Sequence, residues 1–305
     1  MTPDKYVTAT ARPADFDAFW NDVLAQADQI PLNTSMELVP LRSTPEVEVY
    51  EVHYDSLDGV RITGWYCRPR DRQGQLAAIL HLPGYTGEPL LPKATAKLGY
   101  AAFSAAPRGK LRSNAQFNPG YPGLLTHNIV DRHTYSYRGF YLDAVRAFDF
   151  LLSREEVDPA RVGVTGSSQG GGLTLVVAAL RPQVRAAAAG VPYLCGFMEA
   201  IELTHTYPYQ EIRDYLRLYP EREPAVRQTL AYFDGLNFGP RITCPIIVNV
   251  GLQDNVCPPE TGYATFETIA SADKKLYPYA GHGHDGGSLV HEAVIKAFFK
   301  VHLNP

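Results

Sequence analysis

The feature that most constrains how this chain can fold is the pentad Gly166-Ser167-Ser168-Gln169-Gly170. The residues before it, RVGVT, are β-prone, and the apolar run after it, GGGLTLVVAAL, is typical of a buried helix. A strand, a sharp turn and a helix in this order are what a nucleophile elbow requires, with the middle serine exposed at the carboxyl edge of a sheet. The flanking glycines remove side chains where the turned backbone is crowded. We therefore predict Ser168 as a nucleophile; the alternative is a plain glycine-rich turn.

The rest of the chain alternates short apolar runs with helical stretches such as 141–154. This rhythm predicts an α/β fold with a mostly parallel, doubly wound sheet and helices on both faces. The predicted parallel strands lie at 77–83, 100–107, 161–166, 245–254 and 274–283. Before them, Phe16, Phe19 and Trp20 recur at helical spacing, and Asp58-Gly59 between two β-rich runs predicts a hairpin.

Two segments, 110–138 and 197–240, are longer than plain connections. Loops beyond about 12–15 residues usually have a purpose. Insertions in open α/β sheets lie over the carboxyl ends of the strands, where ligands bind. We expect one domain over residues 1–305, with an N-terminal helix and hairpin extension and these two insertions. They would serve substrate access or assembly, or else decorate the surface.

Charge and cysteine content exclude several classes of protein. The 28 Lys+Arg and 32 Asp+Glu residues leave a net charge of −4, which argues against a nucleic-acid partner. No apolar run approaches the roughly 18 residues that span a bilayer, and the N-terminus lacks the apolar core of a signal peptide. We therefore expect a cytoplasmic protein without a membrane partner. The four cysteines stand singly, so neither a zinc site nor a disulfide framework is predicted.

A serine hydroxyl needs a base to remove its proton, and in this fold the chain order is nucleophile, acid, histidine. Asp254 ends a predicted strand in VGLQDNVCPP, where its carboxylate can reach the top of the sheet; its alternative role is to cap the turn. Two histidines, His282 and His284, follow the last predicted strand in YPYAGHGHDGGS, and only one of them can be the base. A metal site is not indicated, because no other ligand group is paired with them by spacing.

A tetrahedral oxyanion needs two hydrogen-bond donors. The residue after the nucleophile, Gln169, supplies one backbone N–H. The second usually comes from the loop after an earlier strand, here HLPGYTGEP. Gly84 permits a turn in this loop, so we choose the N–H of Tyr85; the alternative is a simple Pro-Gly turn.

Several long segments in order resemble carbohydrate esterase family 7, the acetyl xylan esterases and cephalosporin C deacetylases. They are GVTGSSQGGG, VPYLCGF, YFDGLNF, GLQDNVCPP and LYPYAGH…DGG, together with YPGLLTHNIVDRHTYSYRGFYLDAVRA, which resembles the family's interface loop and the helix after it. The likeness runs from about residue 13 to residue 299. It implies an α/β-hydrolase fold, a Ser-Asp-His triad and no cofactor or metal. It also implies removal of acetyl groups from small sugars and from the cephalosporin side chain.

Position by position, the resemblance places the nucleophile at Ser168, the acid at Asp254 and the oxyanion donors at Tyr85 and Gln169. One departure stands out. The family usually carries Arg-Gly-Gln before the interface loop, whereas this chain has lysine at the third position, Lys110.

For the base, the resemblance favours His284, because the sequence HDGG at 284–287 matches the family's His-Glu-Gly-Gly. The number of residues between Tyr279 and the family's histidine position would instead favour His282. Tyr193 and Val256 fall where the family lines its acyl pocket.

The segment 110–138 is also rich in apolar and aromatic residues, which when exposed mark interfaces. They are Tyr121, Pro122, Leu124, Leu125, Ile129, Tyr135 and Tyr137. Members of the family form hexamers, trimers of dimers, through this loop, so we expect a homo-hexamer. The alternative is that the loop folds back over its own domain.

Together these observations predict a serine esterase that deacetylates small acetylated carbohydrates, such as xylo-oligosaccharides, through an acetyl-enzyme, with cephalosporin C as a further substrate. The alternative enzyme is another serine hydrolase, a broad carboxylesterase or a peptidase, because the fold hosts many chemistries. The non-enzymatic alternative is an inactive hydrolase fold that serves as a binding module. The complete set of serine, acid and histidine argues against it.

Overall fold

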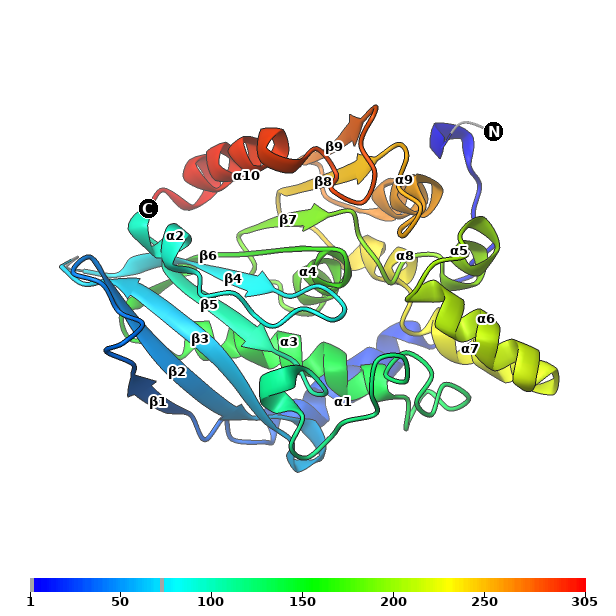
Figure 1. The fold of residues 1–305 in the computed structure, drawn as a ribbon, viewed down its shortest axis with the longest axis horizontal. Coiled ribbons are helices and arrows are strands. Elements are labelled where there is room, and N and C mark those ends of the chain that lie inside the picture. The colour runs from blue at the N-terminus through cyan, green and yellow to red at the C-terminus, as the bar shows by residue number, and fades with distance from the viewer. Residues whose placement is uncertain (1–2, 72–73) are drawn as a thin grey trace.

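The computed structural model describes residues 3–71 and 74–305, and these form a mixed sheet flanked by helices (Figure 1). Nine strands of these residues pair in the order β1-β2-β3-β5-β4-β6-β7-β8-β9. Their bounds are β1 Ser35–Leu38, β2 Val47–Asp55, β3 Arg61–Pro69, β4 Leu76–Leu82, β5 Ala101–Ala106, β6 Val157–Ser167, β7 Ala186–Gly190, β8 Ile246–Gly251 and β9 Lys274–Tyr279. The strands from β5 to β9 along this order are parallel, and β1, β2 and β3 extend the sheet in antiparallel fashion.

The α-helices are α1 Phe16–Asp28, α2 Lys93–Lys97, α3 Ser136–Leu152, α4 Gln169–Leu180, α5 Phe197–Leu203, α6 Tyr209–Leu218, α7 Glu223–Ala231, α8 Gly235–Phe238, α9 Pro259–Thr268 and α10 Ser288–Leu303. Alternate residues of β4 separate the two faces of the sheet, since neighbouring side chains on a strand point to opposite sides. Ala78 and Leu80 join the large core built with α1, α3 and α4, whereas Ala77 and Ile79 join the core under α10. Helices therefore cover both faces, as the sequence predicts. None of the helices within the described residues has the length and hydropathy needed to cross a membrane.

The five predicted parallel strands and the hairpin are confirmed. In the hairpin, β2 pairs with β3 from Val47↔Pro69 to Asp55↔Arg61. Asp58 and Gly59 adopt positive φ angles of 63° and 72° in the connection, a conformation that Asp and Gly tolerate better than most residues.

Two elements differ from the sequence prediction. The parallel strand β7 was not predicted, because it reads Ala-Ala-Ala-Ala-Gly and alanine is depleted in strands. Helix α3 begins at Ser136 rather than at residue 141. Gly139 within its first turns argues against a helix, but the structure needs glycine there, because a Cβ would lie 2.1 Å from Nη1 of Arg108.

The expectation that the apolar residues of segment 110–138 are exposed is wrong for most of them. Five of its seven apolar side chains are buried in the chain's own core: Leu124, Leu125, Ile129, Tyr135 and Tyr137. The hydroxyl of Tyr135 donates to the carbonyl of Leu125 at 2.8 Å, which folds the segment back on itself. Tyr121 stays half-buried and Pro122 exposed. The surface argument for assembly through this segment is thereby removed.

Candidate active site

Ser168 occupies the sharp turn between β6 and α4, at the carboxyl edge of the parallel strands. Its φ of 59° and ψ of −121° are strained for a residue with a side chain. Its N–H donates to the carbonyl of Gly190 at 2.9 Å, which helps to fix this conformation. The flanking glycines have no room for a side chain, since a Cβ on Gly170 would lie 2.1 Å from the carbonyl oxygen of Leu82. The strand, turn and helix predicted from the pentad are present.

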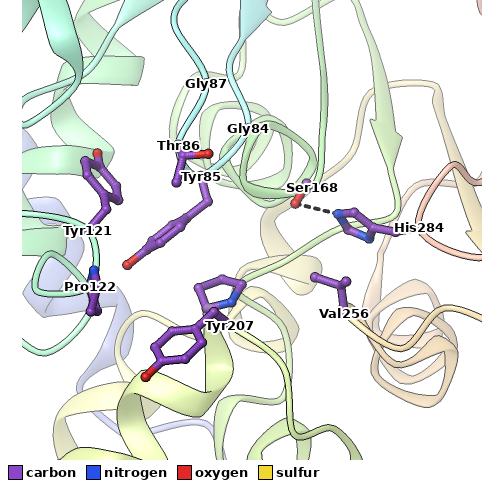
Figure 2. A pocket seen from close by; sticks show the side chains of 11 residues that line it. Gly84, Tyr85, Thr86, Gly87, Tyr121, Pro122, Ser168, Tyr207, Val256 and His284 are labelled. Carbon is purple, nitrogen blue, oxygen red and sulfur yellow. Dashed lines mark hydrogen bonds between the residues drawn. The ribbon is translucent and has the colours of Figure 1, made fainter.

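The loops after β6, β8 and β9 bring three polar side chains into a continuous hydrogen-bonded chain. The Nε2 atom of His284 lies 2.9 Å from Oγ of Ser168 (Figure 2). The Nδ1 atom of His284 lies 2.8 Å from Oδ2 of Asp254. The other carboxylate oxygen of Asp254 accepts the backbone N–H groups of Val256 and Cys257, at 2.8 and 2.9 Å. Both oxygens of the buried carboxylate are therefore satisfied and its orientation is fixed.

The second histidine of the pair has a different partner. Nδ1 of His282 lies 2.6 Å from Oδ2 of Asp285, and this pair is largely solvent-exposed. Asp285 belongs to the HDGG sequence that favoured His284, and here it binds the neighbouring histidine. The structure thus brings His284, and not His282, to Ser168.

The histidine loop is held in place by the end of β8. The side-chain amide of Asn249 donates to the carbonyl of Gly286 at 2.6 Å. Gly251 approaches the loop so closely that a Cβ would lie 1.9 Å from the carbonyl oxygen of Gly283. Sequence reasoning missed both contacts, because a buried strand residue carries no spacing signal for a loop more than 30 positions away.

Ser168 and His284 open into a cleft of about 470 Å³ (Figure 2). Its walls come from the loop after β4, from both insertions and from the loop after β8. The other lining residues are Gly84, Tyr85, Thr86, Gly87, Tyr121, Pro122, Tyr207, Pro208 and Val256. Both insertions therefore border the site, and Val256 lies in its wall as the resemblance implies.

Tyr193 is placed differently from the expectation. Its side chain is fully buried and is not part of the cleft wall. Its ring packs edge-on against Tyr85 and Tyr209, with centroids 6.0 and 4.6 Å apart. Tyr193 therefore packs against Tyr85, which lines the cleft, without lining the cleft itself.

Of the two expected oxyanion donors, Gln169 directly follows Ser168 in the chain, and Tyr85 lines the same cleft as Ser168. No acceptor among residues 3–71 and 74–305 takes the backbone N–H of Tyr85 or Gln169. The side chain of Gln169 is occupied elsewhere, since its amide donates to the hydroxyl of Tyr137 at 2.8 Å. Within the described residues, both backbone N–H groups therefore remain available as donors.

Glu211 on α6 ties the second insertion to the first and to the loop after β4. Its buried carboxylate accepts the Tyr85 hydroxyl at 2.5 Å, the N–H of Gly123 at 2.8 Å and the N–H of Thr126 at 3.1 Å. Burial and then the charge of Glu211 raise the pKa of Tyr85 far above its usual range, so its phenol remains a donor. Sequence reasoning missed Glu211, because a glutamate on a polar helix ordinarily faces solvent.

A serine on a strained strand-to-helix turn, with a histidine and an acid after later strands of a mostly parallel sheet, is the arrangement of an α/β hydrolase. Within the described residues, no three His, Cys or acidic side chains are placed to hold a metal ion.

The chain belongs to the acetyl xylan esterase family, since the family model described as "Acetyl xylan esterase (AXE1)" matches residues 3–303. The solved acetyl xylan esterase from Paenibacillus sp. R4 is 36% identical, with a TM-score of 0.91 over 99% of this chain and 98% of that one. Acetyl xylan esterase 1 from Thermoanaerobacterium sp. JW/SL YS485 is 28% identical, with a TM-score of 0.89 over 98% of each chain. The resemblance to this family and the α/β-hydrolase fold are thereby confirmed.

Acetyl esterase Axe7A of Xylanibacter ruminicola is 31% identical over 294 residues, which cover 90% of this chain. The chain spans 64% of the length of that relative. The family and these relatives indicate a carboxylic ester hydrolase.

Proposed function

We propose that this chain is a serine esterase that removes acetyl groups from small acetylated carbohydrates, such as xylo-oligosaccharides. The observation that carries the proposal is the hydrogen-bonded chain from Asp254 through His284 to Ser168, open to a cleft. The names of the relatives, acetyl xylan esterase and acetyl esterase, support acetate as the acyl group.

In the acylation step, Oγ of Ser168 attacks the acetyl carbonyl carbon while Nε2 of His284 takes the hydroxyl proton. Asp254 accepts the Nδ1–H of the imidazole, which leaves Nε2 free to act as the base, and stabilises the imidazolium that forms. The negative charge that develops on the carbonyl oxygen is bound by the N–H groups of Tyr85 and Gln169. His284 then gives its proton to the sugar oxygen, the ester C–O bond breaks and an acetyl-enzyme remains.

In the second step, water attacks the acetyl-enzyme and His284 takes a proton from it. The same two N–H groups bind the second oxyanion. The bond between the acetyl carbon and Oγ breaks, His284 gives the proton to Oγ of Ser168, and acetic acid leaves and ionises to acetate in solution. One water is consumed in each cycle and the enzyme is regenerated, since His284 gives up each proton that it takes within the same half-reaction.

The shape of the cleft favours an ester with a small acyl group and a small alcohol part as the substrate. Val256 borders the space beside Ser168 and His284, and Tyr121 and Tyr207 from the two insertions narrow the entrance. An acyl methylene that does not fit costs about 1–3 kcal/mol, so a tight wall favours acetate over longer acids. We further propose cephalosporin C, which carries an acetyl ester, as a second substrate of this site.

The proposal is tested by measuring hydrolysis of three compound classes by the full chain: acetylated xylo-oligosaccharides, butyrate esters and peptide anilides. We expect acetate release from the first, weaker activity on the second and none on the third. A preference for butyrate would indicate a broad carboxylesterase, and cleavage of anilides would indicate a peptidase; either preference would contradict the proposal.

The homo-hexamer remains a proposal that rests on the family resemblance. The cytoplasmic location also stays a prediction.

A further inference from the structure

Lys110, the residue at which this chain departs from the family's Arg-Gly-Gln, lies directly behind the loop that carries Tyr85. Its side chain is 1% exposed, which is rare for lysine. The ammonium group donates hydrogen bonds to the carbonyl oxygens of Gly84 and Tyr85. It also lies 5.2 Å from the ring centroid of Tyr121 and 5.9 Å from that of Tyr85, within the range of cation–π attraction.

The contact with Gly84 has a specific consequence for the adjacent N–H group. The carbonyl of Gly84 and the N–H of Tyr85 belong to one planar peptide unit. A cation at the carbonyl oxygen draws electron density from the amide and makes its N–H a stronger donor, as happens in any chain of hydrogen bonds. The same contact fixes the plane of the peptide, and with it the direction in which the N–H points.

We propose that Lys110 is a positioning residue for the oxyanion site, because its ammonium group orients and polarises the Gly84–Tyr85 peptide whose N–H binds the oxyanion. The inference rests on the proposed function and adds a pH control to it. Lys110 touches neither substrate nor Ser168; it acts only through this backbone unit.

The charge on Lys110 changes in the neutral pH range. Burial lowers the pKa of Lys110 to about 7, and the nearby Glu88 opposes this shift. Glu88 itself forms an ion pair with Arg112 at 3.1 Å, so the ammonium relies on backbone carbonyls and aromatic rings. The polarising charge is therefore present below about pH 7 and is lost as the pH rises through that value.

Other titratable and charged groups surround this position and set the background for a pH measurement. They are Glu88 and Tyr85 on the loop after β4, Arg112 on the 3-10 helix Leu111–Ser113, Tyr121 on the first insertion and Glu211 on α6.

The test compares Lys110→Met, which removes both the charge and the donors, with Lys110→Gln, which keeps a neutral donor. Lys97→Met is the matched control, because Lys97 is half-exposed and pairs with Glu46 away from the cleft. The values of kcat and KM for a chromogenic acetyl ester are measured at about pH 6 and about pH 8.5, on either side of the Lys110 titration. Thermal unfolding and labelling of Ser168 by an organophosphonate verify that each variant is folded.

We expect Lys110→Met to lower kcat at the lower pH about tenfold with KM nearly unchanged, less than the roughly 10²–10³-fold loss of a whole oxyanion donor. The ratio of wild-type to variant kcat should shrink at the higher pH, where the wild-type lysine is neutral. Lys110→Gln should lose less of its kcat, and its ratio of wild-type to variant kcat should also shrink at the higher pH. This variant therefore serves as the test if Lys110→Met does not fold. Lys97→Met should match the wild type at both pH values.

Folded Lys110 variants with wild-type kcat at the lower pH, or a ratio that is the same at both pH values, would overturn the role of Lys110. If the wild type were neither labelled at Ser168 nor active on acetyl esters, the proposed function itself would fail. The two failures are therefore distinguishable.

Discussion

At the scale of single residues, the proposed mechanism depends on how Asp254 holds His284. An ionised carboxylate only accepts hydrogen bonds, so in the proposed mechanism the Nδ1 atom of His284, 2.8 Å away, carries the proton. Nε2 then faces the Ser168 hydroxyl without a proton and can take one. The backbone N–H groups of Val256 and Cys257 hold the carboxylate in the position that enforces this tautomer.

The two histidines can be separated by mutation. We expect His284→Ala to lower kcat by about 10⁴-fold or more, because it removes the base. His282→Ala is the matched control and should lose far less, since His282 pairs with Asp285 rather than Ser168. Steady-state kinetics on an acetyl ester measures both variants. A larger loss for His282→Ala would transfer the role of base to His282.

A second prediction at this scale concerns acyl size. Val256→Ala removes two methyl groups from the cleft wall, and we expect the ratio of butyrate to acetate hydrolysis to rise roughly tenfold, in keeping with about 1–3 kcal/mol per accommodated methylene. Tyr193→Phe is the control: it removes a buried hydroxyl that has no partner among the described residues, outside the cleft. The ratio should stay at the wild-type value in this variant. If Tyr193→Phe changed the ratio and Val256→Ala did not, the assignment of the wall would be reversed.

At the scale of elements, the site is assembled by the ends of strands and stabilised by the insertions. Loops after β4, β6, β8 and β9 supply the reactive groups, and α6 in the second insertion reaches across to the first through Glu211. In Figure 1, α6 and α7 extend from the side of the sheet that carries these loops. The insertions therefore shape the cleft as well as border it.

Glu211→Gln tests this link between elements. Both carboxylate oxygens of Glu211 accept hydrogen bonds. In Glu211→Gln, an amide NH₂ replaces one of these oxygens and cannot accept, so a buried donor loses its partner. We expect the free energy of unfolding to fall by about 1–3 kcal/mol, with a lower kcat because Tyr85 loses its anchor. Glu202→Gln is the control, since the Glu202 side chain is 73% exposed and its ion pair is 3.8 Å long. Denaturant unfolding of both variants makes the comparison, and equal stability losses would contradict the role given to Glu211.

The sequence allowed five parallel strands to be predicted, because each is a short apolar run followed or preceded by turn residues. It also allowed the turn at Ser168 to be predicted, because glycines stand two residues before and two residues after it. It could not reveal β7, because an alanine run indicates neither a strand nor a helix with certainty until its neighbours are known. Chain order was enough to propose Asp254 as the acid and to reduce the candidates for the base to His282 and His284. The choice between them depends on the partner of Asp285, a contact across three residues that spacing alone does not determine. Glu211 and Asn249 bind residues that are far away in the sequence. No local sequence pattern could therefore predict these contacts.

At the scale of the whole molecule, assembly is the open prediction. The apolar residues of segment 110–138 lie mostly in the core, so the proposed homo-hexamer rests on the family resemblance and not on an apolar surface of this segment. A closed hexamer of 33.7 kDa chains would have a mass of about 200 kDa. Light scattering after size exclusion measures it, and a single peak near the chain mass would contradict the hexamer.

The central claim is that Ser168 is the nucleophile of an esterase, and covalent labelling tests it most directly. The full chain is treated with an organophosphonate, its intact mass is measured, and the adduct is located by peptide mass spectrometry, with Ser168→Ala as the control. The account predicts one adduct per chain, located on Ser168 and accompanied by complete loss of acetyl ester hydrolysis, and no adduct on Ser168→Ala. An adduct on another residue, or full activity of the Ser168→Ala variant, would contradict it.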